Sequence, residues 1–223
     1  MAHQGFTLER ELRWPAPWSF GAGLAAFALS ALFGTAAAAG QAWFPSRHEE
    51  VVFGILLAAN LLIACALYRF VLARSTEASF WPGGVYNLPR NSWQVAMLLS
   101  AAILGSGVLR FWLGPELGPF IQFREWPTGA TWISDVVLAP LVEEITFRWI
   151  LYRTLRTRLG IVTSATLSSA IFALLHLADV QSMIIAFWLG LVLAAGAERF
   201  RNLEVLVATH SGYNLIALML KTA

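Results

Sequence analysis

Seven apolar segments follow one another along this chain, and most of them are long enough to cross a lipid bilayer. A membrane-spanning α-helix needs about 20 predominantly apolar residues, and a helix satisfies its own backbone hydrogen bonds inside lipid. The sequence therefore predicts an all-α, polytopic transmembrane bundle of about seven spans, or eight if residues 114–130 also cross. The predicted spans are 17–40, 51–73, 92–113, 131–152, 160–178, 180–197 and 203–220.

The composition favours this fold class and excludes several others. Apolar residues make up 58% of the chain and charged residues only 13%. That charged fraction is about half the usual share of a soluble domain. The net charge of +2 is too small to indicate nucleic-acid binding. Because Cys65 is the single cysteine, the chain has no internal disulfide and no cysteine-rich metal site.

The basic residues are divided unevenly between the two sides of the predicted bundle. Eleven arginines lie on the side of the N-terminus and three basic residues on the opposite side, with Arg110 inside a span left out. Positive charge marks cytoplasmic loops, so the chain is predicted to be an integral membrane protein with a cytoplasmic N-terminus. The Ala-rich first span and the small loops favour a bacterial cytoplasmic (inner) membrane. That span exceeds a signal-peptide core of about 7–15 residues, which favours a retained helix.

Nine polar or ionisable residues within the predicted spans stand out as candidates for a structural or functional role. An ionisable group near the bilayer centre costs about 2.5–3.5 kcal/mol, so each one needs a reason. Structural roles explain Asn60 as a hydrogen-bond partner between helices, Arg110 as a snorkelling side chain and Asp135 as a residue near the outer end of its helix. The other six form three helical groups: Glu143, Glu144 and Arg148 in the fourth span, His176 in the fifth, and His210 and Asn214 in the seventh.

The fourth span carries two adjacent glutamates with different expected partners. Glu144 and Arg148 are four residues apart, with the glutamate on the N-terminal side, which is the favourable orientation for an ion pair on one helix face. Glu143 is rotated by about 100° from Glu144 around an α-helix, so it is not well placed to share Arg148. A carboxylate without a partner on its own helix is a candidate general base.

The other two groups each place two side chains one helical turn apart. Phe172 and His176 share a face of the fifth span, and His210 and Asn214 share a face of the seventh. A histidine–asparagine donor pair is suited to bind a developing oxyanion. The helical rise places all three groups about 14–24 Å from the same side of the membrane, so contact between them is feasible. The residues alone leave a catalytic cluster and a polar cluster that bonds neighbouring helices equally open.

The order of these groups resembles the CAAX protease and bacteriocin-processing family. The patterns of that family are EExxxR, FxxxH and HxxxN, and "EEITFR" (143–148), "FALLH" (172–176) and "HSGYN" (210–214) match them in order. The resemblance covers residues 131–220, the implied four-helix catalytic core, and leaves 1–130 as N-terminal transmembrane helices and connecting loops. Trp149 departs from the family, because many members carry glycine there, and this bears on the packing around that turn.

The resemblance implies an intramembrane glutamic endopeptidase, a hydrolase that acts on peptide bonds without a metal or other cofactor. The implied partners are the lipid bilayer and a peptide or protein substrate with a membrane-embedded or lipid-associated segment. The implied roles are water activation by Glu143 assisted by His176, oxyanion stabilisation by His210 and Asn214, and support from Glu144, Arg148 and Phe172.

Three alternatives remain beside this interpretation. One is a non-catalytic membrane scaffold or bacteriocin-immunity protein of the same family, and another is a transporter whose buried carboxylate carries protons. The third is a zinc-dependent membrane protease, since Glu143, His176 and His210 supply a two-histidine, one-glutamate set. The zincin pattern HExxH is absent, because "HEEVV" at 48–52 lacks the second histidine.

Overall fold

The computed structural model describes residues 24–25, 28, 59, 62–63, 66, 88–114, 132–176 and 180–222. These residues are helical almost throughout and include no strand, which confirms the all-α prediction for this part of the chain. Most of the predicted spans 17–40 and 51–73 lies outside the described residues. So do Asn60, residues 115–130 and most of the N-terminal arginines used to predict the orientation.

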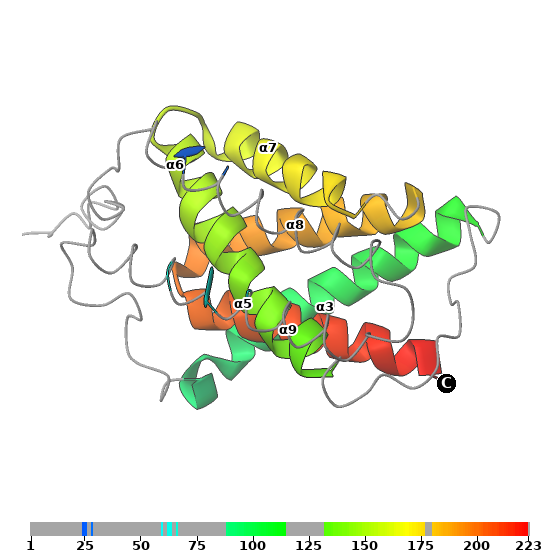
Figure 1. Ribbon diagram of the computed structural model, residues 1–223. Helices are drawn as coiled ribbons and strands as arrows, with labels where there is room; N and C mark the ends of the chain where they lie inside the picture. Colours follow the sequence, from blue (N-terminus) through cyan, green and yellow to red (C-terminus); the bar gives the residue numbers. More distant parts are fainter. Residues whose placement is uncertain are drawn as a thin grey trace, which may run out of the picture.

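The described helices follow the five remaining predicted spans (Figure 1). The fourth span is not one uniform α-helix, because two of its segments are π-helical, with hydrogen bonds to the carbonyl five residues earlier. The elements are α3 (Leu88–Leu113), η4 (Ile133–Leu138, π-helical), α5 (Ala139–Glu143), η5 (Glu144–Tyr152, π-helical), α6 (Arg153–Arg156), α7 (Ile161–Leu174), α8 (Val180–Phe200) and α9 (Leu203–Thr222).

The π-helical geometry surrounds the two glutamates. π-helical segments are mostly single turns and are frequent at functional sites, whereas η5 extends over nine residues. Pro140, at the start of α5, has no N–H to donate to the preceding turn. The backbone hydrogen bonds therefore change from the π-helical to the α-helical pattern beside Pro140, which has no N–H to continue the π-helical pattern.

Helix α3 is apolar on all sides but buries only one of them. Leu98, Ala102 and Ser106 are spaced four residues apart and are buried against the bundle. On the outer side, Phe111 and Trp112 are 84% and 80% exposed. A helix that is apolar all round is suited either to full burial or to a membrane, and α3 is not fully buried.

Two of the described helices are long and apolar enough to cross a membrane, at Arg90–Leu113 in α3 and Val180–Phe200 in α8. The apolar helix α7 is shorter than these two. The described helices are therefore consistent with a membrane protein, and the predicted number of spans stays a prediction.

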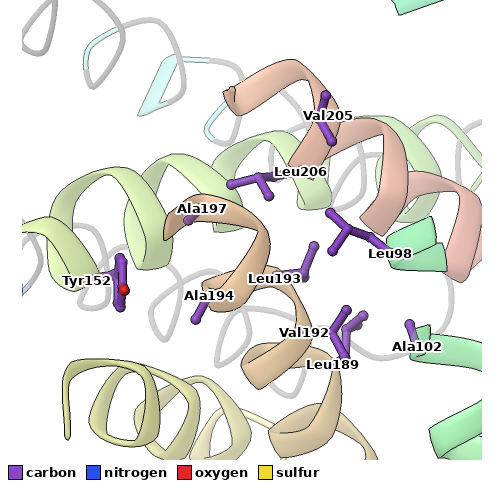
Figure 2. Packing of buried hydrophobic residues seen from close by; sticks show 10 residues of the cluster. All are labelled: Leu98, Ala102, Tyr152, Leu189, Val192, Leu193, Ala194, Ala197, Val205 and Leu206. Carbon is purple, nitrogen blue, oxygen red and sulfur yellow. The ribbon is translucent and has the colours of Figure 1, made fainter. Parts of the chain in front are cut away.

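The main core lies where α3, α8 and α9 meet (Figure 2). Tyr152, at the end of η5, joins this core, and its hydroxyl donates to Glu198 Oε2 at 2.7 Å. Arg156 donates to both carboxylate oxygens of Glu198, through Nε and Nη2, at 3.1 Å each. These bonds fix the end of the glutamate-bearing helix to α8. The buried residues of this cluster are Leu98, Ala102, Tyr152, Leu189, Val192, Leu193, Ala194, Ala197, Val205 and Leu206.

Close approach of α3 to α8 depends on a glycine. Trp188 Nε1 donates to the carbonyl oxygen of Ala101 at 3.3 Å, and its indole lies directly over Gly105. A Cβ atom at Gly105 would overlap the indole ring, which is rigid and cannot bend away. Only glycine allows the two helices to approach this closely.

We expect Gly105→Ala to lower the free energy of unfolding by about 1–3 kcal/mol, the usual cost of overpacking a core. Gly107→Ala is the matched control in the same helix, because nothing lies within 4 Å of its added Cβ. That control should be neutral or slightly stabilising, since alanine is the better helix former. Thermal unfolding in detergent micelles measures both, and equal midpoints would contradict the close contact.

Candidate active site

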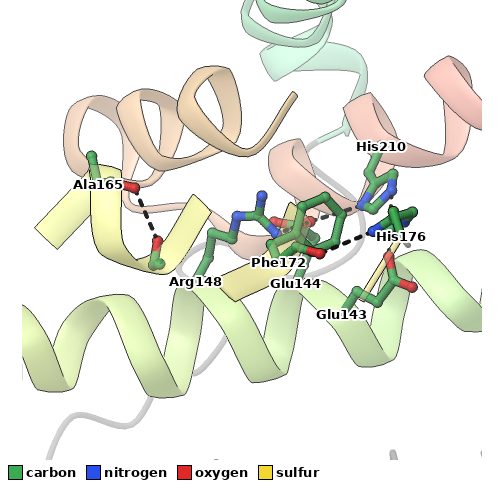
Figure 3. A network of polar contacts seen from close by, with 8 residues as sticks. Glu143, Glu144, Arg148, Ala165, Phe172, His176 and His210 are labelled. Atoms are coloured by element: carbon green, nitrogen blue, oxygen red, sulfur yellow. Dashed lines mark hydrogen bonds and ion pairs between the residues drawn. The ribbon is translucent and has the colours of Figure 1, made fainter. Parts of the chain in front are cut away.

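The structure brings together the glutamates and histidines of all three sequence groups (Figure 3). Glu143 ends α5, and Glu144 and Arg148 lie in η5. His176 follows the end of α7, and His210 lies in the middle of α9. The cluster therefore depends on the packing of three separate helical segments and not on one local motif.

Glu144 is completely buried and binds two cationic or donor groups with one oxygen. Arg148 Nη1 donates to Glu144 Oε1 at 3.1 Å, the pair that the spacing of four residues predicts. His210 Nδ1 donates to the same oxygen at 2.8 Å. Sequence reasoning assigned Glu144 only its pair with Arg148. The hydrogen bond between Glu144 and His210 joins residues that are 66 positions apart, so no local sequence pattern predicts it.

Glu143 faces the other side of the same imidazole. Its Oε2 lies 3.5 Å from His210 Nε2, so His210 stands between the two glutamates, one nitrogen toward each. The charge of Glu143 also interacts with His176. Glu143 retains 29% side-chain exposure, whereas His210 retains 2% and Glu144 none. Of the two adjacent carboxylates, Glu143 is the one that an incoming molecule reaches.

His176 is oriented by the end of its own helix. Its Nδ1 donates to the carbonyl oxygen of Phe172 at 2.9 Å. The same carbonyl also accepts the backbone N–H of Leu175 at 3.2 Å, and a carbonyl oxygen has two lone pairs, so it can accept from both groups. With the Nδ1 hydrogen used in this way, Nε2 of the neutral ring is the nitrogen left to accept a proton or a hydrogen bond.

Asn214 lies one turn after His210 but binds in a different direction. Its Nδ2 donates to the carbonyl oxygen of Asp135 in η4 at 2.8 Å. The predicted donor pair is therefore divided in this structure, with His210 against the glutamates and Asn214 against η4. The second hydrogen of the Asn214 amide remains for another acceptor. The sequence offers no signal for this bond, because its acceptor is a main-chain carbonyl.

The residues proposed for the zinc alternative lie in this same cluster. Within the residues that the structure describes, no three His, Cys, Asp or Glu side chains are arranged as a group that could hold a metal ion. Both ring nitrogens of His210 face carboxylates instead.

Comparison with protein families gives a match over the region that contains this cluster. Residues 125–216 match the family described as Rce1-like, type II CAAX prenyl endopeptidase Rce1-like. The matched region contains the glutamates, Arg148, both histidines and Asn214. No curated protein and no solved structure gives a significant match to the chain.

Proposed function

We propose that the chain is an intramembrane glutamic endopeptidase, because residues 125–216 match the Rce1-like family of type II CAAX prenyl endopeptidases, which suggests a membrane protease. It hydrolyses a peptide bond of a membrane-associated substrate with water activated by Glu143. The observation that carries this proposal is the placement of Glu143, a partly exposed carboxylate within 3.5 Å of the buried His210. A general base has to meet both substrate and water, and Glu143 combines exposure with fixed neighbours.

The peptide bond is hydrolysed in two steps, in which water adds to the scissile carbonyl and the tetrahedral intermediate then breaks down. No covalent bond to the enzyme forms. Glu143 takes a proton from the water as the water oxygen bonds to the scissile carbonyl carbon. The carbonyl oxygen becomes an oxyanion, which His210 stabilises as a hydrogen-bond donor together with the second amide hydrogen of Asn214, the one that Asp135 does not accept. When the carbon–nitrogen bond breaks, the proton held by Glu143 passes to the leaving amine. His176 assists by accepting a hydrogen bond from the water through Nε2.

Glu144 has a part in this mechanism beyond its pair with Arg148. His210 can donate to the oxyanion through Nε2 while Nδ1 donates to Glu144 only as an imidazolium, because only that form carries hydrogen on both nitrogens. The two neighbouring carboxylates supply the negative charge that compensates it. Glu144 thereby orients His210, in the way that a buried aspartate orients the histidine of a serine protease.

The substrate that fits this site has an apolar or lipid-associated segment beside its scissile bond. Leu174 and Leu175, directly before His176, are 53% and 51% exposed, so two apolar side chains precede the histidine of the site. We propose a bacterial cytoplasmic membrane as the location, which the Ala-rich first span and the small loops favour, and a cytoplasmic N-terminus, which the distribution of arginine favours. The bilayer then delivers the substrate laterally.

A comparison of membrane and secreted proteomes tests this function. Cells that make Glu143→Gln instead of the wild-type chain should accumulate an uncleaved precursor, and the purified wild-type chain in liposomes should cleave that precursor. Cleavage should persist after exhaustive chelation, and a loss that added Zn²⁺ restores would favour the zinc protease. A phenotype that survives Glu143→Gln would favour the scaffold or immunity protein. Proton flux across liposomes without any cleavage would favour the transporter.

A further inference from the structure

Arg148 is a buried cation whose hydrogen bonds do not fully compensate it. The side chain is 1% exposed, and Nη1 donates to Glu144 Oε1. In the part of the chain that the structure describes, neither Nε nor Nη2 of Arg148 has a hydrogen-bond acceptor. Buried charge is costly unless other groups stabilise it, so the rest of the stabilisation has to come from a different kind of contact.

The ring of Phe172 supplies that contact. The guanidinium carbon of Arg148 lies 4.5 Å from the centroid of the Phe172 ring, well within the range of a cation–π interaction. The ring of Phe147 is a more distant neighbour of the guanidinium, at 5.9 Å. Cation–π attraction is strongest where both groups are dry, and Phe172 is only 1% exposed.

The same phenylalanine also contacts both histidines of the site. Its ring centroid lies 4.7 Å from that of His176 and 5.9 Å from that of His210. Its carbonyl oxygen accepts the Nδ1 hydrogen of His176. Phe172 is thus in contact with the cation that holds Glu144, with the ring that Glu144 orients and with the histidine beside Glu143 (Figure 3).

We propose that Phe172 is a positioning residue that holds Arg148 through the π face of its ring. It thereby maintains the relative positions of the Glu144, His210 and Glu143 side chains. The proposal rests on the proposed peptidase function. Arg148 and His210 share one oxygen of Glu144, so a guanidinium that leaves the ring shifts that oxygen. His210 Nε2 then loses its alignment with Glu143 and with the oxyanion. An apolar side chain of similar size would fill the space without holding the cation.

Fluorination of the ring separates this role from packing. Phenylalanine analogues with one, two or three fluorine atoms at position 172 keep the ring shape while weakening its negative face. We expect kcat for peptide cleavage to fall stepwise along the series, by about tenfold at the trifluorinated ring, with little change in KM. The matched control is the same series at Phe187, which packs against the same apolar cluster as Phe172. Among the described residues no cation lies over the Phe187 ring, so that series should be flat.

The outcomes distinguish the two levels of the proposal. A flat series at Phe172 in an active enzyme, or an equal slope at Phe187, overturns the positioning role and leaves the peptidase function intact. No cleavage by the wild-type chain overturns the peptidase function itself. A third measurement, thermal unfolding in the wild-type and Arg148→Met backgrounds, tests the contact without activity. The dependence of the midpoint on fluorination should vanish in Arg148→Met, and a dependence that persists there overturns the cation–π assignment.

Discussion

Glu143→Gln is expected to lower kcat for peptide cleavage by about 10²–10⁴-fold, the range that general acid–base catalysis contributes. Glutamine has the shape of glutamate and can remain beside His210, but it cannot take a proton from the attacking water. The effect should therefore appear in kcat, with the protein still folded. Cleavage of the accumulated precursor by purified protein in liposomes measures it.

Glu204→Gln is the matched control for that substitution. Glu204 lies in the first turn of α9, is 6% exposed, and has no contact with the cluster around His210 among the interactions of the described residues. The same change of a buried carboxylate to an amide should leave cleavage near the wild-type rate. Wild-type turnover by Glu143→Gln would contradict the proposed mechanism, and equal losses at both positions would point to a general effect on folding.

Arg148→Met is expected to lower the free energy of unfolding by about 3–5 kcal/mol, the cost of leaving one member of a buried ion pair alone. Glu144 is fully buried and would keep only His210 as a partner. Activity should fall as well, because the oxygen that orients His210 loses its second donor. Denaturant titration in mixed micelles measures the stability, and precursor cleavage measures the activity.

The double variant Glu144→Gln/Arg148→Met separates charge from packing. With both charges removed, much of the stability should return, because replacing a whole buried pair is far less costly than breaking it. Activity should not return, because the Nδ1 nitrogen of His210 has lost the Glu144 carboxylate that orients the ring. Arg199→Met, at an exposed arginine of α8 that lies 5.8 Å from the centroid of the Phe200 ring, is the control and should change stability by no more than about 1 kcal/mol. If the free energy of unfolding of Arg148→Met is close to that of Arg199→Met, the buried ion pair of Arg148 with Glu144 does not stabilise the protein as we propose.

Features set by local spacing could be predicted from the sequence. The lengths of the apolar segments that became α3 and α8 are visible in composition alone, since a span has to cover the hydrocarbon core. The pairing of Glu144 with Arg148 follows from helical periodicity, and the structure contains it. The catalytic role of Glu143 stays a prediction that Glu143→Gln tests, and the assisting role of His176 stays a prediction as well.

Features set by tertiary packing could not be predicted in the same way. Depth in the membrane suggested that His210 could approach the glutamates, but not that one ring nitrogen would bind Glu144 and the other face Glu143. The direction of Asn214 depends on a backbone carbonyl of η4, which no side-chain pattern encodes. The π-helical turns were also missed, because hydrophobicity along a span does not distinguish bonds to the fourth residue from bonds to the fifth.

The unequal exposure of the two adjacent carboxylates has a consequence for inhibitor chemistry. A small molecule that enters the site meets the accessible Glu143, while Glu144 lies sealed behind His210. A warhead aimed at carboxylates would therefore modify one glutamate of the pair, although the two are neighbours in sequence. For the proposed peptidase, the part of an inhibitor outside this contact would then determine selectivity, and its lipophilicity becomes a design variable.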